Sequence, residues 1–180
     1  MEGPCLTVAH ELFAPAESSS FNGSFDLPFL KSGPDLYEFL EPLSWQVELT
    51  NTGGAILMTG TVEGCAKTAC ARCLESFDMR LVGEVEGYFL LGQDDSAPHD
   101  REEDEFEVLP DDRVIELASY LKAAILLELP LIPLCDQDCK GLCPQCGQNR
   151  NLEACTCLPE QCLPVEPANP FDILKDISFD

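Results

Sequence analysis

The stretch SWQVELTNTGGAILMTGTVEG, residues 44–64, sets the fold class. Its centre, Asn51-Thr52-Gly53-Gly54, is rich in residues that tolerate a positive φ, and the runs SWQVELT and AILMTGTVEG flank it. Two such runs joined by a turn of this composition predict a β-hairpin. The chain is therefore expected to contain an antiparallel sheet.

A further strand is predicted after this hairpin, in SFDMRLVGEVEGYFLL, residues 76–91. Phe77, Met79 and Leu81 alternate with polar residues, and Val85 lies between two glutamates. This two-residue period is typical of a half-buried strand, whose apolar side needs a partner. Residues 1–43 carry scattered apolar positions, and only CLTVAHELF, residues 5–13, indicates a strand there.

Residues 111–130, DDRVIELASYLKAAILLELP, predict the best helix of the chain. Asp111 or Asp112 is expected to cap its first amides and Pro130 to end it, so that it spans about residues 112–129. The predicted class is α+β, a mostly antiparallel twisted sheet with one amphipathic helix packed on it and an irregular cysteine-rich tail. The apolar face of the helix comprises Val114, Leu117, Ala118, Leu121, Ile125 and Leu129.

The chain divides into three parts by composition. Residues 1–134 form a β-rich domain that ends with the helix, and its residues 92–105, GQDDSAPHDREEDE, are expected to be a solvated acidic loop. Residues 135–162 contain seven of the eleven cysteines and are expected to form a cysteine-rich, zinc-binding segment. Residues 163–180 form a tail with a short terminal helix, in which Asn169 is the N-cap and Pro170 the first helical residue.

The charge of the chain is strongly acidic. Its 33 Asp and Glu residues against ten Lys and Arg give a formal net charge of −23. Such a surface repels nucleic-acid phosphates and suits a basic protein partner. The alternative is that the charge serves only to keep the protein soluble. Direct binding to nucleic acid is therefore disfavoured.

The start of the chain and its apolar runs predict a cytoplasmic protein. The first residues lack the basic start and unbroken apolar stretch of a secretory signal. The longest apolar run, AAILLELPLIPL, is interrupted by Glu128, Pro130 and Pro133 and is too short to span a bilayer. We therefore expect no membrane association and a reducing compartment, where clustered cysteines favour a metal or catalysis over disulfides.

Six of the eleven cysteines lie within CDQDCKGLCPQCGQNRNLEACTC, residues 135–157. Zinc takes four thiolates at about 2.3 Å, and a Cys-x-x-Cys turn such as CPQCG supplies two of them. Gly147 lets the backbone turn under the metal, and a Cys-x-Cys pair farther along closes the set. The predicted first zinc site is Cys143, Cys146, Cys155 and Cys157.

A possible second site combines distant cysteines. Cys70 and Cys73 form another Cys-x-x-Cys pair in CARC, and Cys135 and Cys139 remain in the cysteine-rich segment. These four would tie the tail to the β-rich body. Alternatively, one zinc ion uses some of Cys135, Cys139, Cys143 and Cys146, and Cys70 and Cys73 act separately.

A thioredoxin-like redox pair is another alternative for Cys70 and Cys73, since Arg72 between them would lower a thiol pKa. The residues that follow predict a strand, however, and not the helix of such proteins. The other cysteines, Cys5, Cys65 and Cys162, are expected to be single thiols.

An all-cysteine set is closed, so the expected one or two zinc ions are structural and the chain is not expected to be an enzyme. Neither His10 nor His99 has the context of a catalytic base, and no pair of carboxylates stands out.

Three segments, CARCLESF, LLELPLIPLCDQDCKGLCPQCGQNRNLEACTC and NPFDILKDI, resemble the YceD family, the large ribosomal RNA subunit accumulation proteins. The resemblance runs from about Val62 to the C-terminus. It implies a small bacterial or plastid factor that supports 23S ribosomal RNA accumulation, with a presumed metal site and no known catalysis. Its motif positions are the eight cysteines of the two predicted sites. One departure is Asn169-Pro170-Phe171-Asp172, which replaces the family's Asp-Pro-Arg-Leu-like sequence, so the role of that arginine cannot be transferred.

The resemblance and the charge together predict how the protein acts. We expect it to meet a basic ribosomal protein or a large-subunit assembly intermediate and to affect the RNA through that partner, with binding that weakens as salt rises. The alternatives are a direct nucleic-acid-binding zinc module, a thiol redox or zinc-responsive switch and, more remotely, a hydrolase.

Overall fold

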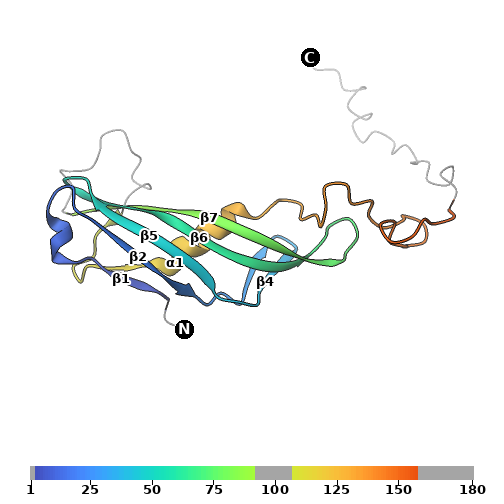
Figure 1. The fold of residues 1–180 in the computed structure, drawn as a ribbon, viewed down its shortest axis with the longest axis horizontal. Coiled ribbons are helices and arrows are strands. Elements are labelled where there is room, and N and C mark those ends of the chain that lie inside the picture. Colours follow the sequence, from blue (N-terminus) through green and yellow to red (C-terminus); the bar gives the residue numbers. More distant parts are fainter. Residues whose placement is uncertain (1–2, 92–106, 158–180) are drawn as a thin grey trace, which may run out of the picture.

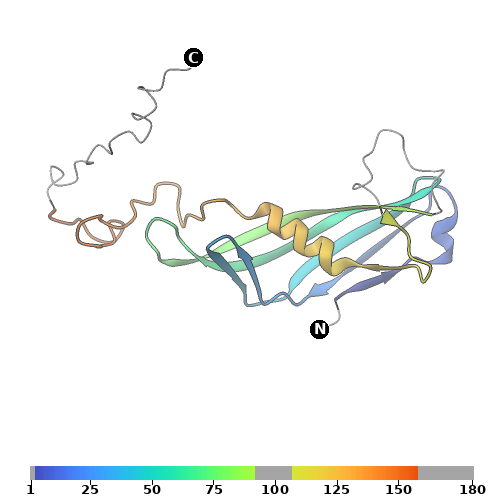
Figure 2. The same ribbon diagram turned by 180° about the vertical axis from the view of Figure 1, so that it is seen from behind.

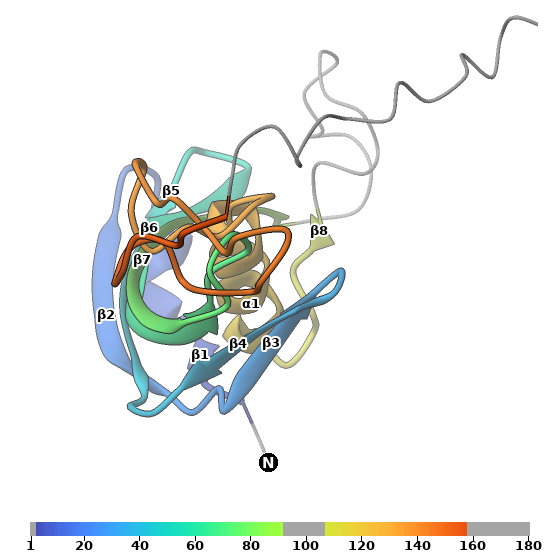
Figure 3. The same ribbon diagram turned by 90° about the vertical axis from the view of Figure 1, so that its right-hand side faces the viewer.

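The computed structural model describes residues 3–91 and 107–157. Its largest unit is a seven-stranded sheet, which curls around one helix (Figure 1, Figure 3). The predicted α+β class, with its mostly antiparallel sheet, single helix and cysteine-rich tail, is confirmed. The elements in chain order are β1 (Cys5–Thr7), the 3-10 helix η1 (His10–Phe13), β2 (Ser18–Phe25), β3 (Phe29–Ser32), β4 (Asp35–Phe39), β5 (Leu43–Asn51), β6 (Ala55–Ala69), β7 (Ser76–Leu90), β8 (Glu107–Val108), β9 (Val114–Glu116) and α1 (Leu117–Glu128).

The predicted hairpin is present as β5 and β6. The Asn51 side-chain oxygen accepts a hydrogen bond of 2.7 Å from the Gly53 N–H, and Gly53 has a φ of +101°, which glycine adopts without strain. The predicted third strand is β7, which pairs with β6 along its whole length. Its buried Leu81, Val85 and Phe89 follow the two-residue period that the sequence predicts.

The N-terminal third completes this sheet. β2 pairs with β5, and the β3–β4 hairpin pairs with the far end of β6, on the side opposite β7. These three strands were not predicted from the sequence. The predicted strand in residues 5–13 is correct only for β1, since His10–Phe13 form η1.

The helix begins later than predicted. It spans Leu117–Glu128, not residues 112–129, because Val114–Glu116 form β9 and pair with β1 in a separate two-stranded sheet. Asp112 accepts a hydrogen bond from the Val114 N–H in the turn before β9 and does not cap the helix. Residues 114–116 form a strand and not the first turn of the helix because this strand pairs with the main-chain groups of β1. Local periodicity cannot show that a distant segment needs this pairing.

Two clusters of buried side chains stabilise the described residues. The large one fills the space between the sheet and α1, where Leu117, Leu121 and Ile125 are fully buried. The small one lies at the β6–β7 turn and contains cysteines packed against Phe77 and Leu134. Seen from behind, α1 lies across one face of the sheet and residues 131–157 extend past that turn (Figure 2). The predicted acidic loop 92–105, terminal helix and Cys162 lie outside the described residues.

Candidate metal centres

The first cysteine group, which we call the turn centre, comprises Cys70, Cys73, Cys135 and Cys139. The turn after β6 holds the first two: the Cys70 N–H donates to the Glu75 carbonyl, and the Leu74 N–H donates to the Cys70 carbonyl, both at 2.9 Å. The chain after α1 then lies beside this turn, because the Ala71 N–H donates to the Pro133 carbonyl at 2.8 Å.

The sulfur atoms of the turn centre have the spacing of a zinc site. The Cys70 and Cys139 sulfurs are 3.8 Å apart and those of Cys73 and Cys135 are 3.7 Å apart. A tetrahedron with zinc–sulfur bonds of about 2.3 Å has edges of about 3.8 Å, whereas a disulfide needs about 2.05 Å. All four sulfurs lie within 4.8 Å of one another, so the group fits one tetrahedral ion.

The second group, the tail centre, comprises Cys143, Cys146, Cys155 and Cys157, again with all sulfurs within 4.8 Å. A tight turn carries the first two, in which the Gly147 N–H donates to the Cys143 carbonyl at 2.9 Å. Gly147 has a φ of +72°, as expected where the backbone turns beneath a metal. Cys143 is buried, and the other three sulfur-bearing residues are at least partly exposed.

The local electrostatics favour the thiolate form of Cys70 in the turn centre and of Cys143 in the tail centre. Burial opposes ionisation of Cys70, but main-chain N–H groups, that of Cys135 first, lower its pKa to about 6. The Cys146 N–H likewise helps to lower the pKa of Cys143 to about 6. Desolvation and the neighbouring sulfurs raise the pKa of Cys135 to about 12, and the Cys146 sulfur together with desolvation does the same for Cys157. A divalent cation among the sulfurs would remove this repulsion and let all four ionise.

Arg72 holds the cysteine-rich segment against the β6–β7 turn through hydrogen bonds. Its guanidinium donates to the main-chain carbonyls of Gln137 and Cys139, at 3.2 and 3.0 Å, and its own carbonyl accepts from the Leu142 N–H at 3.0 Å. Gly141, with a φ of +67°, lies against that carbonyl, and a Cβ there would be 2.9 Å from the oxygen. The arginine between the two turn cysteines therefore positions the main chain that carries Cys139.

Asn151 connects the two centres. In the sequence it stands between the two cysteine pairs of the tail centre, yet its Nδ2 donates a hydrogen bond of 3.3 Å to the Cys139 sulfur of the turn centre. Its Oδ1 accepts from the Lys140 N–H at 2.7 Å, and Asn149 Oδ1 accepts from both its main-chain and side-chain N–H groups. Such contacts to a metal-bound sulfur orient the ligand and offset its charge.

The structure therefore brings together the two sets of four that the sequence predicts. It places Cys135 and Cys139 with Cys70 and Cys73, and not with Cys143 and Cys146 as in the one-zinc alternative. The Cys70 and Cys73 pair lies between two antiparallel strands, without the helix of a thioredoxin-like site. The predicted single thiols Cys5 and Cys65 are exposed and belong to neither centre. Asn151 was missed, since no local motif marks it.

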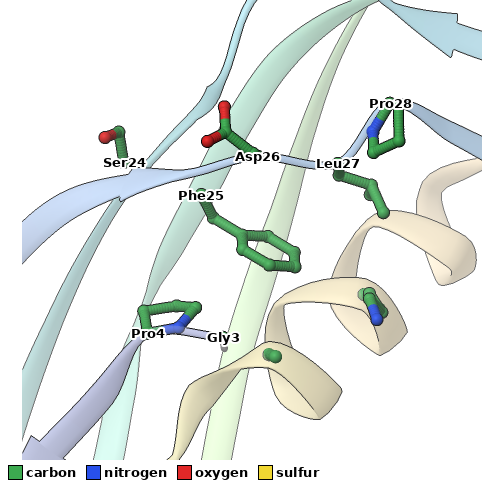
Figure 4. A pocket seen from close by; sticks show the side chains of 9 residues that line it. Gly3, Pro4, Ser24, Phe25, Asp26, Leu27 and Pro28 are labelled. Carbon is green, nitrogen blue, oxygen red and sulfur yellow. The ribbon is translucent and has the colours of Figure 1, made fainter. Parts of the chain in front are cut away.

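A cavity elsewhere in the molecule has no cysteine or histidine in its lining. It has a volume of about 700 Å³ and lies between the chain around β2 and one side of α1 (Figure 4). Phe25 and Leu27 point toward the helix, and Asp26 points away from it. Lys122 is the other titratable residue of the lining, and its ammonium group lies 5.8 Å from the centre of the Phe25 ring. This lining contains no pair of groups arranged for acid–base catalysis.

Comparison with known proteins identifies the family. The family model described as "Large ribosomal RNA subunit accumulation protein YceD" matches residues 58–178, about two thirds of the chain, and this range includes all eight clustered cysteines. The chain belongs to the YceD family. The match begins within β6, so β1 to β5 of this YceD protein lie outside it.

Two relatives illustrate the range of similar proteins. An uncharacterized protein of Mycobacterium tuberculosis is 38% identical over 105 residues, which are 58% of this YceD chain and 49% of the relative. A large ribosomal RNA subunit accumulation protein YCED homolog of Arabidopsis thaliana, described as chloroplastic, is 24% identical over 144 residues, 67% of this chain and 45% of the relative. The chain thus spans about half the length of these relatives. No solved structure matches it.

In the part of this YceD protein that the structure describes, no helix has the length and apolar character needed to cross a bilayer.

Proposed function

We propose that this protein is a non-enzymatic factor that supports the accumulation of large-subunit ribosomal RNA, 23S RNA in bacteria, and that two structural zinc ions hold its C-terminal part. The pair of closed four-cysteine sets carries the proposal. Four thiolates fill the tetrahedral shell of zinc and leave no position for a substrate, so the ion would supply stability and not chemistry. The description of the YceD family names the process.

The charge of the chain supports action through a basic partner. A net charge of −23, to which each four-thiolate zinc site would add about −2, attracts Lys- and Arg-rich proteins and repels phosphate. A Lys- and Arg-rich ribosomal protein, free or bound to a large-subunit assembly intermediate, has the required positive charge. The proposal places the protein in the cytoplasm of a bacterium, where ribosomes are assembled.

Metal analysis tests the first half of the proposal. Protein purified under reducing conditions is expected to contain two zinc ions per chain, one for each centre. The double variant Cys155→Ser, Cys157→Ser should contain one. The matched double variant Cys5→Ser, Cys65→Ser, which removes two exposed thiols outside both centres, should retain two. Metal-free protein whose tail is bridged by disulfides under these conditions would contradict the proposal.

Complementation tests the second half. In a strain that lacks the gene, the wild-type chain and the Cys5→Ser, Cys65→Ser control should restore the ratio of large- to small-subunit RNA. A Cys70→Ser, Cys73→Ser variant, which removes half of the turn centre, should not. Tight binding of the purified protein to bare 23S RNA at physiological salt, with a steep loss of affinity as salt rises, would instead identify a direct RNA-binding module.

A further inference from the structure

The second half of α1 is apolar on its outer face as well as on its inner face. Ala124 and Ile125 are buried against the sheet, but Leu127 is 83% exposed and Leu126 is 46% exposed. The chain that follows continues this surface with Leu131, 99% exposed, and Ile132, 64% exposed. A helix that is apolar all round is normally covered, and adjacent exposed aliphatic side chains mark interaction sites.

Leu127 also lines a groove. It has a volume of about 310 Å³, and β7 and α1 line it through Glu84, Glu86, Tyr120, Ala123, Leu127 and Glu128, among others. The two elements approach closely at Gly83, where a Cβ would lie 2.6 Å from the Ala124 carbonyl oxygen. We call this feature the α1–β7 groove. Its lining has three carboxylates and no basic residue.

One wall of the α1–β7 groove belongs to a strand with an open edge. β6 pairs with one side of β7, and β8 pairs with the other side only at Phe89 and Leu90. Along residues 76–87, no strand among the described residues pairs with that outer side. An extended peptide can add to such an edge through main-chain hydrogen bonds while its side chains contact the neighbouring surface.

We infer that the α1–β7 groove binds an extended segment of a protein partner, with aliphatic side chains on Leu127 and Leu131 and Lys or Arg side chains beside Glu84, Glu86 and Glu128. The inference rests on the proposed function, since it names the surface that meets the basic partner. Charge complementarity selects this occupant: three carboxylates in the same lining as the exposed Leu127 match cations next to aliphatic groups. RNA would bring its phosphates against the same carboxylates, which repel them.

A pair of matched substitutions tests the groove in the full-length, zinc-loaded chain. The probe is the protein fraction extracted from purified large ribosomal subunits, and each component retained by the wild type is identified and titrated in purified form. Leu127→Asp should weaken binding about tenfold or more, as expected for a central contact. Leu40→Asp adds the same charge at a residue that is 78% exposed between β4 and β5, and it should leave the affinity within about twofold. Far-ultraviolet circular dichroism verifies that both variants fold.

The outcomes separate this inference from the proposed function. If the wild type retains a basic protein and the two variants bind it equally, the groove is not the binding surface, although the proposed function stands. If the wild type retains no ribosomal protein, both fail.

A photo-crosslinking amino acid at Leu131 identifies the occupant directly. A crosslink to a Lys- and Arg-rich segment of the retained protein is expected. A crosslink to RNA, to a second copy of the chain or to residues 158–180 of the same chain overturns the inference.

Discussion

Replacing Asn151 by aspartate removes the contact between the two centres while changing one atom of the side chain. The Nδ2 donor to the Cys139 sulfur is lost, and Oδ1 can still accept from the Lys140 N–H. Hydrogen bonds to charged groups contribute about 1.5–3 kcal/mol, and the exposure of Asn151 favours the lower value. A carboxylate 3.3 Å from a thiolate adds about 1 kcal/mol of repulsion in the dielectric of water. The sum, about 2.5 kcal/mol, predicts roughly 60-fold weaker zinc binding at the turn centre.

Competition with a chromophoric chelator measures this loss, and mass mapping of alkylated cysteines shows which centre releases its ion first. Asn151→Asp should release zinc from the turn centre first. Asn151→Ala loses the hydrogen bond without the repulsion, so its loss should be about tenfold. Gln137→Glu, which adds one charge at an exposed position of the same segment, is the matched control. If Asn151→Asp holds both ions as tightly as this control, the connection between the centres has no energetic role.

Three further predictions concern backbone, protonation and metal removal. Gly141→Ala should speed zinc release more than Gly147→Ala. Both positions have a positive φ, which costs about 1–2 kcal/mol for alanine, but only at position 141 would the added Cβ meet a main-chain oxygen. Equal rates of zinc release from the two variants would contradict this reasoning. In metal-free protein at pH 7, iodoacetamide should label Cys143 before Cys157, because a pKa of about 6 leaves the Cys143 thiol ionised and a pKa of about 12 leaves the Cys157 thiol protonated. Labelling of Cys143 should slow as the pH falls below 6. Mass spectrometry of the labelled peptides measures the order, and labelling of Cys157 first would contradict this prediction. Chelation of the metal should make the cysteine-rich segment sensitive to protease while the sheet signal in circular dichroism persists, because the two clusters of buried residues are separate. If the sheet signal is lost together with the protease resistance, the two parts form a single cooperative unit.

The strands that the sequence predicts are those whose signals are local. The Asn-Thr-Gly-Gly turn specifies the β5–β6 hairpin through its own hydrogen bond and positive φ, and β7 shows a clear two-residue period. β2 has no comparable pattern, since its sequence SSSFNGSF buries only Phe25 fully. It becomes a strand because the edge of β5 is available for pairing, which depends on contacts distant in the sequence.

The same distinction applies to the helix and the cysteines. The periodicity that begins at Val114 is real, but pairing with β1 turns residues 114–116 into β9, so the first helical residue depends on a segment more than a hundred residues upstream. The grouping of the cysteines was among the alternatives that the Cys-x-x-Cys and Cys-x-Cys spacings allow, and the structure shows two sets of four. The contact of Asn151 with Cys139 could not be predicted, since it arises only when the segment that carries Asn151 folds back onto Cys139 and Lys140.

The sequence separation within the turn centre also sets an order of events during synthesis. Cys73 precedes Cys135 by 62 residues, and β7 and α1 lie between them. A growing chain exposes Cys70 and Cys73 early, but it can enclose an ion only after α1 and residues 135–139 have been made. The turn centre can therefore be completed only after the sheet strands and α1 have been synthesised, and we expect a metal-starved cell to accumulate chains whose sheet is formed while the turn centre stays open.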